Sequence, residues 1–181
     1  MLQNLNWKSG EQPSDTALAE LRGKAFAFTS VAPRAADILR AGAAPYDGAI
    51  LSAYAAADLA GYVALWPTQL VHSAGEAPLA LLGPLMVDPR YQGIGLGRSL
   101  MRRILSFADT AGLPPILLVG DQSYYEQFGF ENAVSRNWQM PGLAAPERVL
   151  TRSLGPLPQA GAVTAQPLAA FAPPCNQQTA A

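Results

Sequence analysis

Cysteine, histidine and charged residues are scarce in this chain. Among its 181 residues, Cys175 is the single cysteine and His72 the single histidine. One cysteine cannot build an internal disulfide framework or a cysteine-based zinc cage. We therefore expect a cytoplasmic protein.

The charge balance and the short apolar runs exclude two classes of partner. Lys and Arg number 12 against 13 Asp and Glu, so there is no basic excess to bind nucleic acid. No apolar stretch approaches the roughly 18 residues that a membrane helix needs, and residues 1–10 lack the apolar core of a signal peptide. We expect a protein that binds neither nucleic acid nor membrane.

Length and periodicity predict one main domain, residues 1–154, followed by a tail. The tail, residues 155–181, is rich in Pro and Ala and has no charged side chain, so it either packs along the surface in part or stays mobile. Apolar residues at three- and four-residue steps predict helices, and apolar runs predict strands. The helices are expected at residues 16–28, 35–41 and 97–111, and the strands at residues 2–9, 49–56, 59–71, 79–87, 114–121 and 137–140, with residues 147–154 as a strand or a turn.

Three alternate glycines precede the helix predicted at the centre of the chain. Residues 81–101 read LLGPLMVDPRYQGIGLGRSLM, which is an apolar strand, a turn, Gly93, Gly95 and Gly97, and then a helix. Without Cβ atoms the backbone there can bend sharply and let a ligand approach closely. The first N–H groups of the helix lack partners and carry the positive end of its dipole, so the segment predicts a pyrophosphate-binding loop. The loop residues expected at the phosphates are Gln92, Gly93, Ile94, Gly95, Leu96, Gly97 and Arg98.

The spacing of this loop separates it from two other phosphate-binding loops. A Walker A loop requires a lysine after its last glycine, but Arg98 follows Gly97. A dinucleotide fingerprint G-x-G-x-x-G that starts at Gly93 would need a glycine at position 98. The pattern Q-x-x-G-x-G does fit, with Gln92, Gly95 and Gly97. In this pattern the chain resembles the GNAT superfamily of acetyl-coenzyme A (acetyl-CoA) dependent N-acetyltransferases.

A second segment strengthens the resemblance. After the strand predicted at residues 114–121, the sequence has the Y-x-x-x-G-F element of this superfamily, with Tyr125, Gly129 and Phe130. Ser123 begins a capping box, so a short helix is expected to start at Ser123 and to end at Gly129.

The resemblance implies an α/β (α+β) fold with acetyl-CoA as co-substrate and no metal. A mixed, mostly antiparallel central sheet would be flanked by helices, and its strands would splay at the coenzyme site. The pantetheine arm would bind the backbone of Leu85, Met86 and Val87, with Tyr124 close to the coenzyme. Gly83-Pro84, which is unusual inside a strand, would mark the separation of the strands. Tyr125 would act as general acid towards the leaving thiolate, or Tyr124 if the register is shifted by one residue.

An N-acetyltransferase of this kind would act on the primary amine of a small molecule or an amino-acid-like substrate. Its acceptor specificity would come from the first two helices and the hairpin loops. The general base stays open between Asp121, Glu76, His72 and water, and the remaining phosphate of the coenzyme could meet Arg98, Arg102 or Arg103. The alternative function is a non-catalytic CoA or acyl-CoA binding module. A monomer and a homodimer are both compatible with the sequence.

Overall fold

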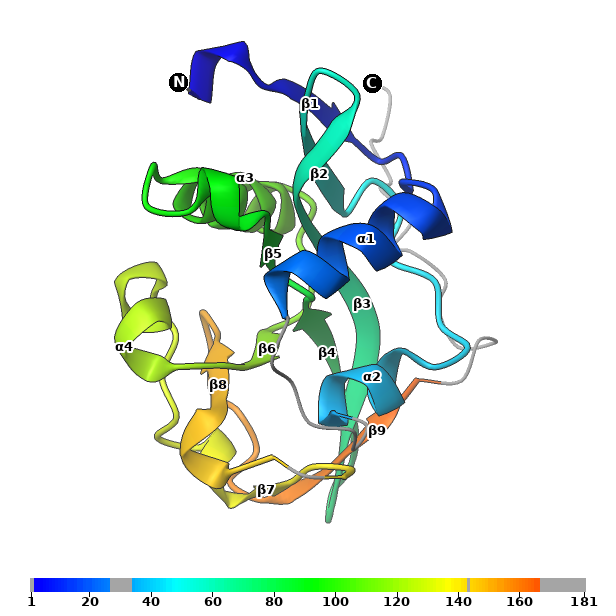
Figure 1. The fold of residues 1–181 in the computed structure, drawn as a ribbon. Helices are drawn as coiled ribbons and strands as arrows, with labels where there is room; N and C mark the ends of the chain where they lie inside the picture. The colour runs from blue at the N-terminus through cyan, green and yellow to red at the C-terminus, as the bar shows by residue number, and fades with distance from the viewer. Residues whose placement is uncertain (1, 27–33, 143, 167–181) are drawn as a thin grey trace, which may run out of the picture.

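A computed structural model describes residues 2–26, 34–142 and 144–166 of the chain. Its centre is a sheet with the strand order β1-β2-β3-β4-β6-β8, which β5, β7 and β9 join at the side (Figure 1). The pairs β4 with β6 and β7 with β9 are parallel, whereas the other strand pairs are antiparallel. The mixed, mostly antiparallel sheet expected from the sequence is therefore confirmed. The strands are β1 (Asn6–Ser9), β2 (Ile50–Ala55), β3 (Asp58–His72), β4 (Gly75–Leu82), β5 (Met86–Val87), β6 (Ile116–Val119), β7 (Trp138–Gln139), β8 (Val149–Arg152) and β9 (Gly161–Ala165).

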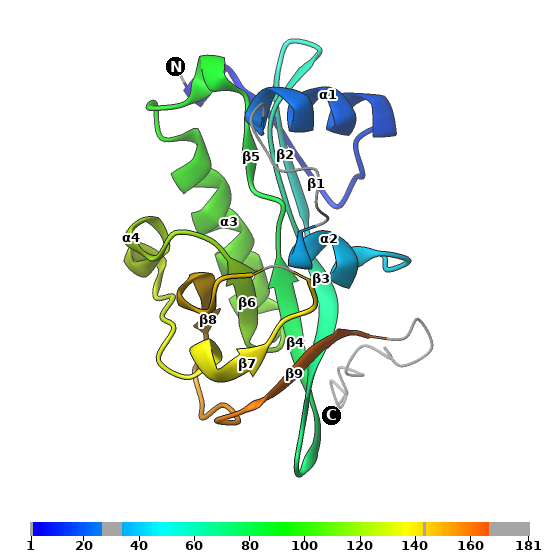
Figure 2. The same ribbon diagram turned by 60° about the horizontal axis from the view of Figure 1, so that its bottom comes forward.

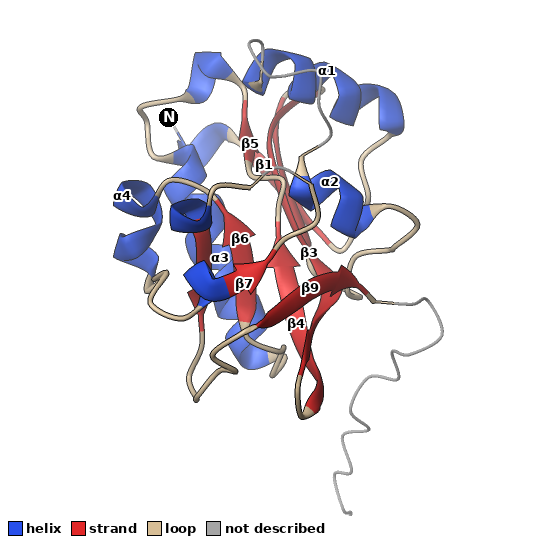
Figure 3. Cartoon of the chain, turned by 90° about the horizontal axis from the view of Figure 1, so that it is seen from below, coloured by secondary structure: helices blue, strands red, loops and turns tan. Residues whose placement is uncertain are grey.

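Helices cover both faces of the sheet. Helices α1 and α2 lie on one side of it and α3 and α4 on the other (Figures 1 and 3). Alternating side chains of β3 serve the two faces: Val63 packs in a cluster with Leu100 of α3, and Tyr62 packs in a cluster with Leu21 of α1. Both faces of the sheet are therefore buried. The helices are α1 (Asp15–Ala25), α2 (Ala35–Arg40), α3 (Leu96–Thr110) and α4 (Gln122–Tyr125).

The strand predicted at residues 79–87 is two strands, and this part of the prediction is wrong. β4 pairs with the end of β3, from Leu65 to His72, whereas β5 pairs with Gly61 and Tyr62 of the same strand. The chain leaves the ladder at Gly83, whose φ of 140° suits glycine, and at Pro84, which has no N–H to donate. The Gly83-Pro84 pair thus marks the place where the strand breaks.

Two helix ends also differ from the prediction. Helix α1 ends at Ala25, and position 28, where the sequence predicted its end, lies outside the described residues. Helix α4 begins after Asp121, whose carboxylate accepts hydrogen bonds from the backbone N of Ser123 at 3.0 Å and from its hydroxyl at 2.9 Å. Asp121 is therefore the N-cap, and the predicted start at Ser123 is wrong by one residue. The helix continues as a 3-10 turn, Glu126–Phe128, and ends at Gly129 with a φ of 82°.

The segment assigned to the tail contributes a strand to the sheet. β9 pairs antiparallel with β3, where the Thr68 hydroxyl donates to the carbonyl oxygen of Thr164 at 2.7 Å, and it runs parallel beside β7 (Figure 2). Gly161 comes so close to β3 that a Cβ on it would lie 2.6 Å from the Val71 carbonyl oxygen. Residues 167–181, with Cys175, lie outside the described residues, so the division at residue 154 stays a prediction.

Candidate active site

Two neighbouring strands diverge at the centre of the molecule. β4 and β6 pair only at Ala80 with Ile116 and Leu81 with Leu117. Beyond these pairs β5 follows β3, while β6 continues along β8. A gap therefore opens between residues 83–87 and residues 118–120, as expected for strands that splay at a coenzyme site.

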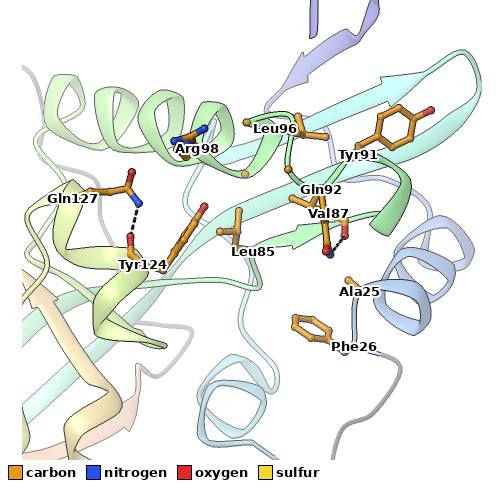
Figure 4. Close-up of a pocket in the computed structure, with 13 residues that line it drawn as sticks. Ala25, Phe26, Leu85, Val87, Tyr91, Gln92, Leu96, Arg98, Tyr124 and Gln127 are labelled. Atoms are coloured by element: carbon orange, nitrogen blue, oxygen red, sulfur yellow. Dashed lines mark hydrogen bonds between the residues drawn. The ribbon is translucent and has the colours of Figure 1, made fainter. Parts of the chain in front are cut away.

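The backbone of β5 presents alternate groups to this gap. The N–H of Asp88 donates to the Ala60 carbonyl oxygen of β3 at 2.9 Å. The N–H and C=O groups of successive residues point to opposite sides of a strand. Those of Met86 therefore point to β3, as the N–H of Asp88 does, and those of Leu85 and Val87 point to the gap. The Val87 carbonyl oxygen accepts a hydrogen bond of 3.3 Å from Gln92 Nε2 (Figure 4).

The local geometry explains why glycine occupies each of the three loop positions. Gly93 and Gly95 have φ of 75° and 89°, which L-residues with a side chain adopt only at a cost. Gly95 is the N-cap of α3 and no side chain caps that end, so the first N–H groups of the helix are available to an anion. A Cβ on Gly97 would lie 3.0 Å from the Tyr124 hydroxyl, so glycine there permits close approach.

A cavity of about 450 Å³, hereafter the loop cavity, lies over this glycine loop (Figure 4). Figure 4 shows the Tyr124 ring reaching from α4 towards the start of α3, beside Leu85. The buried side chain of Met86 packs against α1, and neither Met86 nor Ile94 lines the cavity. The predicted residues that do line it are Leu85, Val87, Gln92, Gly93, Gly95, Leu96, Gly97, Arg98 and Tyr124.

Four residues that line the loop cavity were not predicted from the sequence. Ala25 and Phe26 at the end of α1, Tyr91 in the turn before the loop, and Gln127 after α4 also face the loop cavity. For Tyr91 the signal was its place next to Gln92, and for Gln127 its place inside the Y-x-x-x-G-F element. Nothing local marks Ala25 and Phe26, because they reach the cavity through the packing of α1 on the sheet.

Of the three arginines considered for the last coenzyme phosphate, Arg98 lines the loop cavity. Arg102 and Arg103 line a different hollow, where the guanidinium carbon of Arg103 lies 4.4 Å from the centroid of the Trp7 ring. Only Arg98 among them is thus placed next to the glycine loop.

Tyr125 faces a second cavity of about 620 Å³, hereafter the arginine cavity, on the α1 and α2 side of the gap. The two cavities share Leu85 and Phe26, so they meet at the gap. The Tyr125 ring packs edge-on against Tyr124 at 4.9 Å between centroids. Burial raises the pKa of Tyr125 to about 12, so the phenol keeps its proton at neutral pH.

The side chains proposed as general base do not gather at the gap. Asp121 is exposed and caps α4, and its hydrogen bonds from Ser123 lower the pKa of its carboxyl. His72 and Glu76 lie in the turn region between β3 and β4, and they line neither the loop cavity nor the arginine cavity. Within the described ranges, no group of three or more His, Cys, Asp or Glu side chains is arranged to hold a metal ion.

The sheet with its diverging strands, together with the glycine loop, defines the acyl-CoA N-acyltransferase type of fold. A GNAT family acetyltransferase from Brucella melitensis in complex with acetyl-CoA superposes with a TM-score of 0.65 at 25% identity, covering 90% of this chain and 96% of that one. The Escherichia coli protein YhbS in complex with CoA superposes with a TM-score of 0.67 at 23% identity over 90% of each chain, which is a likeness of fold. No helix in residues 2–26, 34–142 and 144–166 is long and apolar enough to cross a membrane.

The sequence comparisons agree with the fold. The acetyltransferase (GNAT) domain model matches residues 47–132, which include both motifs. The protein named uncharacterized N-acetyltransferase YjhQ, from Escherichia coli K12, is 29% identical over 115 residues, which are 63% of this chain and 62% of YjhQ. YhbS from the same strain is 34% identical over 73 residues, so the match spans 40% of this chain and 42% of YhbS. The domain match over residues 47–132 and the fold together support the GNAT superfamily.

Proposed function

We propose that the protein is an N-acetyltransferase that transfers the acetyl group of acetyl-CoA to a primary amine of a small molecule or an amino-acid-like substrate. The observation that carries this proposal is the gap between residues 83–87 and 118–120. The glycine loop opens on one side of the gap and Tyr125 lines the other side. A thioester held in the gap would be within reach of both cavities. The names of YjhQ and YhbS support the same reaction class.

The chain offers main-chain groups to each part of the co-substrate. The uncapped amides at the start of α3 bind the pyrophosphate, helped by the positive end of the helix dipole. The gap-facing amides of Leu85 and Val87 bind the pantetheine arm in the way that the edge of a sheet binds an added strand. Arg98 binds the remaining phosphate. Acetyl-CoA supplies the activated acetyl group.

The residues that line the gap orient the substrates and supply a proton to the leaving sulfur. They form no covalent bond to the acetyl group. The neutral amine attacks the thioester carbonyl, the new N–C bond forms, and the C–S bond breaks. A backbone N–H of Leu85 or Val87 stabilises the oxyanion, and Tyr125 donates its proton to the leaving sulfur and regains one from solvent. Alignment of two bound substrates alone can lower a barrier by roughly 7–11 kcal/mol.

Water takes the proton of the attacking amine in this proposal. Among the described residues that line the two cavities, the one carboxylate is Asp37, and two arginines already bind it. Both oxygens of Asp37 already accept hydrogen bonds from these arginines, and Asp121 is engaged in capping α4. Ordered water in the gap therefore fits better than a side chain.

Thermal unfolding in the presence of CoA, acetyl-CoA and NAD tests the binding part. A ligand at 100 times its dissociation constant stabilises by about 2.7 kcal/mol, which raises Tm by roughly 5–11 °C for a chain of this size. We expect this rise with CoA and acetyl-CoA. A rise with NAD and none with either form of CoA would contradict the proposal.

Replacement of Tyr125 by Phe tests the chemical part. Loss of a general acid lowers kcat by about 10²–10⁴-fold, while the Tm rise with CoA is retained because Tyr125 faces the other cavity. Tyr124→Phe is the matched contrast: its ring lines the loop cavity, so we expect a raised KM for acetyl-CoA and a nearly normal kcat. The opposite pattern would move the general acid to Tyr124.

The alternative, a non-catalytic CoA-binding module, predicts the same Tm rise but no release of thiol with any amine. Retention of a partly buried, protonated tyrosine at the gap favours the enzyme, because binding alone gives that hydroxyl no task.

A further inference from the structure

The arginine cavity lies where an acceptor would meet the acetyl group. Its walls come from α1, α2, the diverging strands and the segment before β8. It meets the loop cavity at Leu85 and Phe26, and Tyr125 lines it. An amine that enters this cavity approaches the gap from the side opposite to the glycine loop.

Positive charge dominates the lining of this cavity. Among its described lining residues are four arginines, Arg22, Arg34, Arg40 and Arg148, and a single carboxylate, Asp37. Asp37 is shared, since Arg22 Nη2 donates to one of its oxygens at 2.8 Å and Arg40 Nη2 donates to the other. One carboxylate cannot neutralise these guanidinium groups, so the cavity has an excess of positive charge.

Among the residues that the structure describes, no carboxylate lies within ion-pair distance of Arg34 or Arg148, although the charge of Arg148 contributes to lowering the pKa of Asp121. The guanidinium carbon of Arg34 lies 4.4 Å from the centroid of the Phe26 ring, at the border between the two cavities. Nε of Arg148 lies 3.5 Å from the Gly120 carbonyl oxygen, beside the end of β6. Both groups therefore keep donors for an anion.

Arg40 is partly buried, and among the described residues one of its buried nitrogen atoms is without a hydrogen bond. Its side chain is 11% exposed, and Nη1 has no hydrogen-bond partner within the described part of the chain. Nη1 lies 3.5 Å from the position that a Cβ on Gly83 would take, next to the strand break. A guanidinium group with an unused donor in a buried place is costly unless an anion joins it. Arg40 on one edge of the gap and Arg148 on the other thus flank the place of acyl transfer.

We propose that the acceptor is a small amine that also carries a carboxylate, and that Arg40 and Arg148 bind this carboxylate while the amine points to the gap. This inference rests on the proposed transferase function and names its substrate class. Guanidinium groups suit carboxylates because they donate two parallel hydrogen bonds to them. Polyamines and other cationic acceptors are disfavoured by the same charge. A cavity of about 620 Å³ is in the range of small-molecule sites.

Two pairs of acceptors that differ only in the carboxylate, and one contrast between an acidic amine and a polyamine, test the substrate class. Thiol release from acetyl-CoA is followed with β-alanine against its amide, with leucine against leucinamide, and with glutamate against spermidine. We expect kcat/KM to be about 10-fold to 100-fold higher for the carboxylates, as for a charge-assisted hydrogen bond. Equal rates with each acid and its amide, or faster acetylation of spermidine, would overturn the proposal. Turnover of peptides with acidic N-terminal segments, without turnover of free amino acids, would overturn the assignment to a small acceptor.

Substitutions of the cavity arginines test whether the preference for a carboxylate over its amide arises in the arginine cavity. Arg148→Gln changes an exposed side chain, and we expect it to reduce the preference for the acid without loss of folding. Arg40→Gln should abolish the preference, and Arg40→Lys should restore part of it. Arg136→Gln is the control, because Arg136 is exposed and lines neither cavity. A preference that survives both the Arg40 and the Arg148 variants would refute the role of these residues.

Binding of the product separates failure of this inference from failure of the transferase proposal. With CoA present, N-acetyl-β-alanine should raise Tm in the parent protein, whereas its amide should not, and Arg148→Gln should reduce the difference. If this binding is observed but no amine is acetylated, the anion site stands and the transferase proposal fails. If amines are acetylated but acid and amide bind alike, the transferase proposal stands and the anion site is refuted.

Discussion

Asp88 lies in the turn between β5 and the glycine loop, and the effect of replacing it can be worked out from its contacts. Its side chain is 1% exposed, and it accepts hydrogen bonds from the backbone N of Arg90 at 2.9 Å and from Arg90 Nε and Nη2 at 3.1 and 2.9 Å. These bonds, helped by Lys24, lower the pKa of Asp88 to about 2 from the usual 3.8. At about 1.4 kcal/mol per pKa unit, the ionised carboxylate stabilises the fold by about 2 kcal/mol, as an upper figure because Arg90 and Lys24 are about half exposed.

The sign of the pH dependence follows from the direction of this shift. Because the folded pKa lies below the unfolded one, the stabilisation is complete above about pH 5 and is lost as the pH falls towards 2. We predict that Asp88→Asn unfolds more easily than the parent by about 2 kcal/mol at pH 6, and that the difference narrows by about 1 kcal/mol at pH 3. Urea unfolding of both proteins across this pH range measures it.

Asp58→Asn is the matched control for this experiment. Asp58 also contacts Arg90, at 3.2 Å, but its side chain is 61% exposed. We expect Asp58→Asn to change the free energy of unfolding by less than about 1 kcal/mol at every pH. If the parent and Asp88→Asn differ by the same amount from pH 7 to pH 3, the buried carboxylate does not act through its charge.

Four glycine substitutions test other parts of the structure. Gly95→Ala should lower the free energy of unfolding by about 1–2 kcal/mol, because the φ of Gly95 is 89°. Gly23→Ala, on the exposed face of α1, should raise it by about 0.5–1 kcal/mol. Urea unfolding measures both changes, and equal effects would contradict the loop geometry. Gly120→Ala would place a Cβ 2.3 Å from the Tyr125 ring and displace that ring. Thiol release should therefore fall as in Tyr125→Phe, while the Tm rise with CoA is retained. Normal turnover would argue against this position of the ring. Gly161→Ala would place a Cβ 2.6 Å from a β3 carbonyl oxygen, so stability should fall by about 1–3 kcal/mol, and an unchanged Tm would show that β9 adds little to the sheet.

The glycine loop was readable from the sequence because its requirements are local. Gly93 and Gly95 adopt positive φ, Gly97 permits the approach of Tyr124, and α3 starts at Leu96, directly after Gly95. Each of these demands is met within a few residues, so the residue types and their spacing express it directly. The ends of α4 are also local, but Asp121 and Ser123 are both good N-cap residues, and the carboxylate of Asp121 took the position.

The arginine cavity and β9 were not readable in the same way. Arg22, Arg40 and Arg148 come from distant parts of the chain and meet only when α1 and α2 pack against the diverging strands. β9 is a short segment in a stretch rich in Pro, Ala and Gly, and its partner is a strand about 90 residues earlier in the chain. Propensity and pattern carry little information on such long-range contacts.

The two cavities differ in the material of their walls, and this difference bears on how the protein can diversify. The loop cavity, where we propose that the coenzyme binds, includes the glycine loop and the main-chain N–H groups at the start of α3, which a substitution elsewhere leaves in place. The arginine cavity, where we propose that the acceptor binds, is lined by arginine side chains from α1, α2 and the segments before α2 and β8. Exchange of a few of these side chains would redirect the chain to a new amine while the donor half keeps working, so a change of substrate and a loss of activity are separable events in this scaffold.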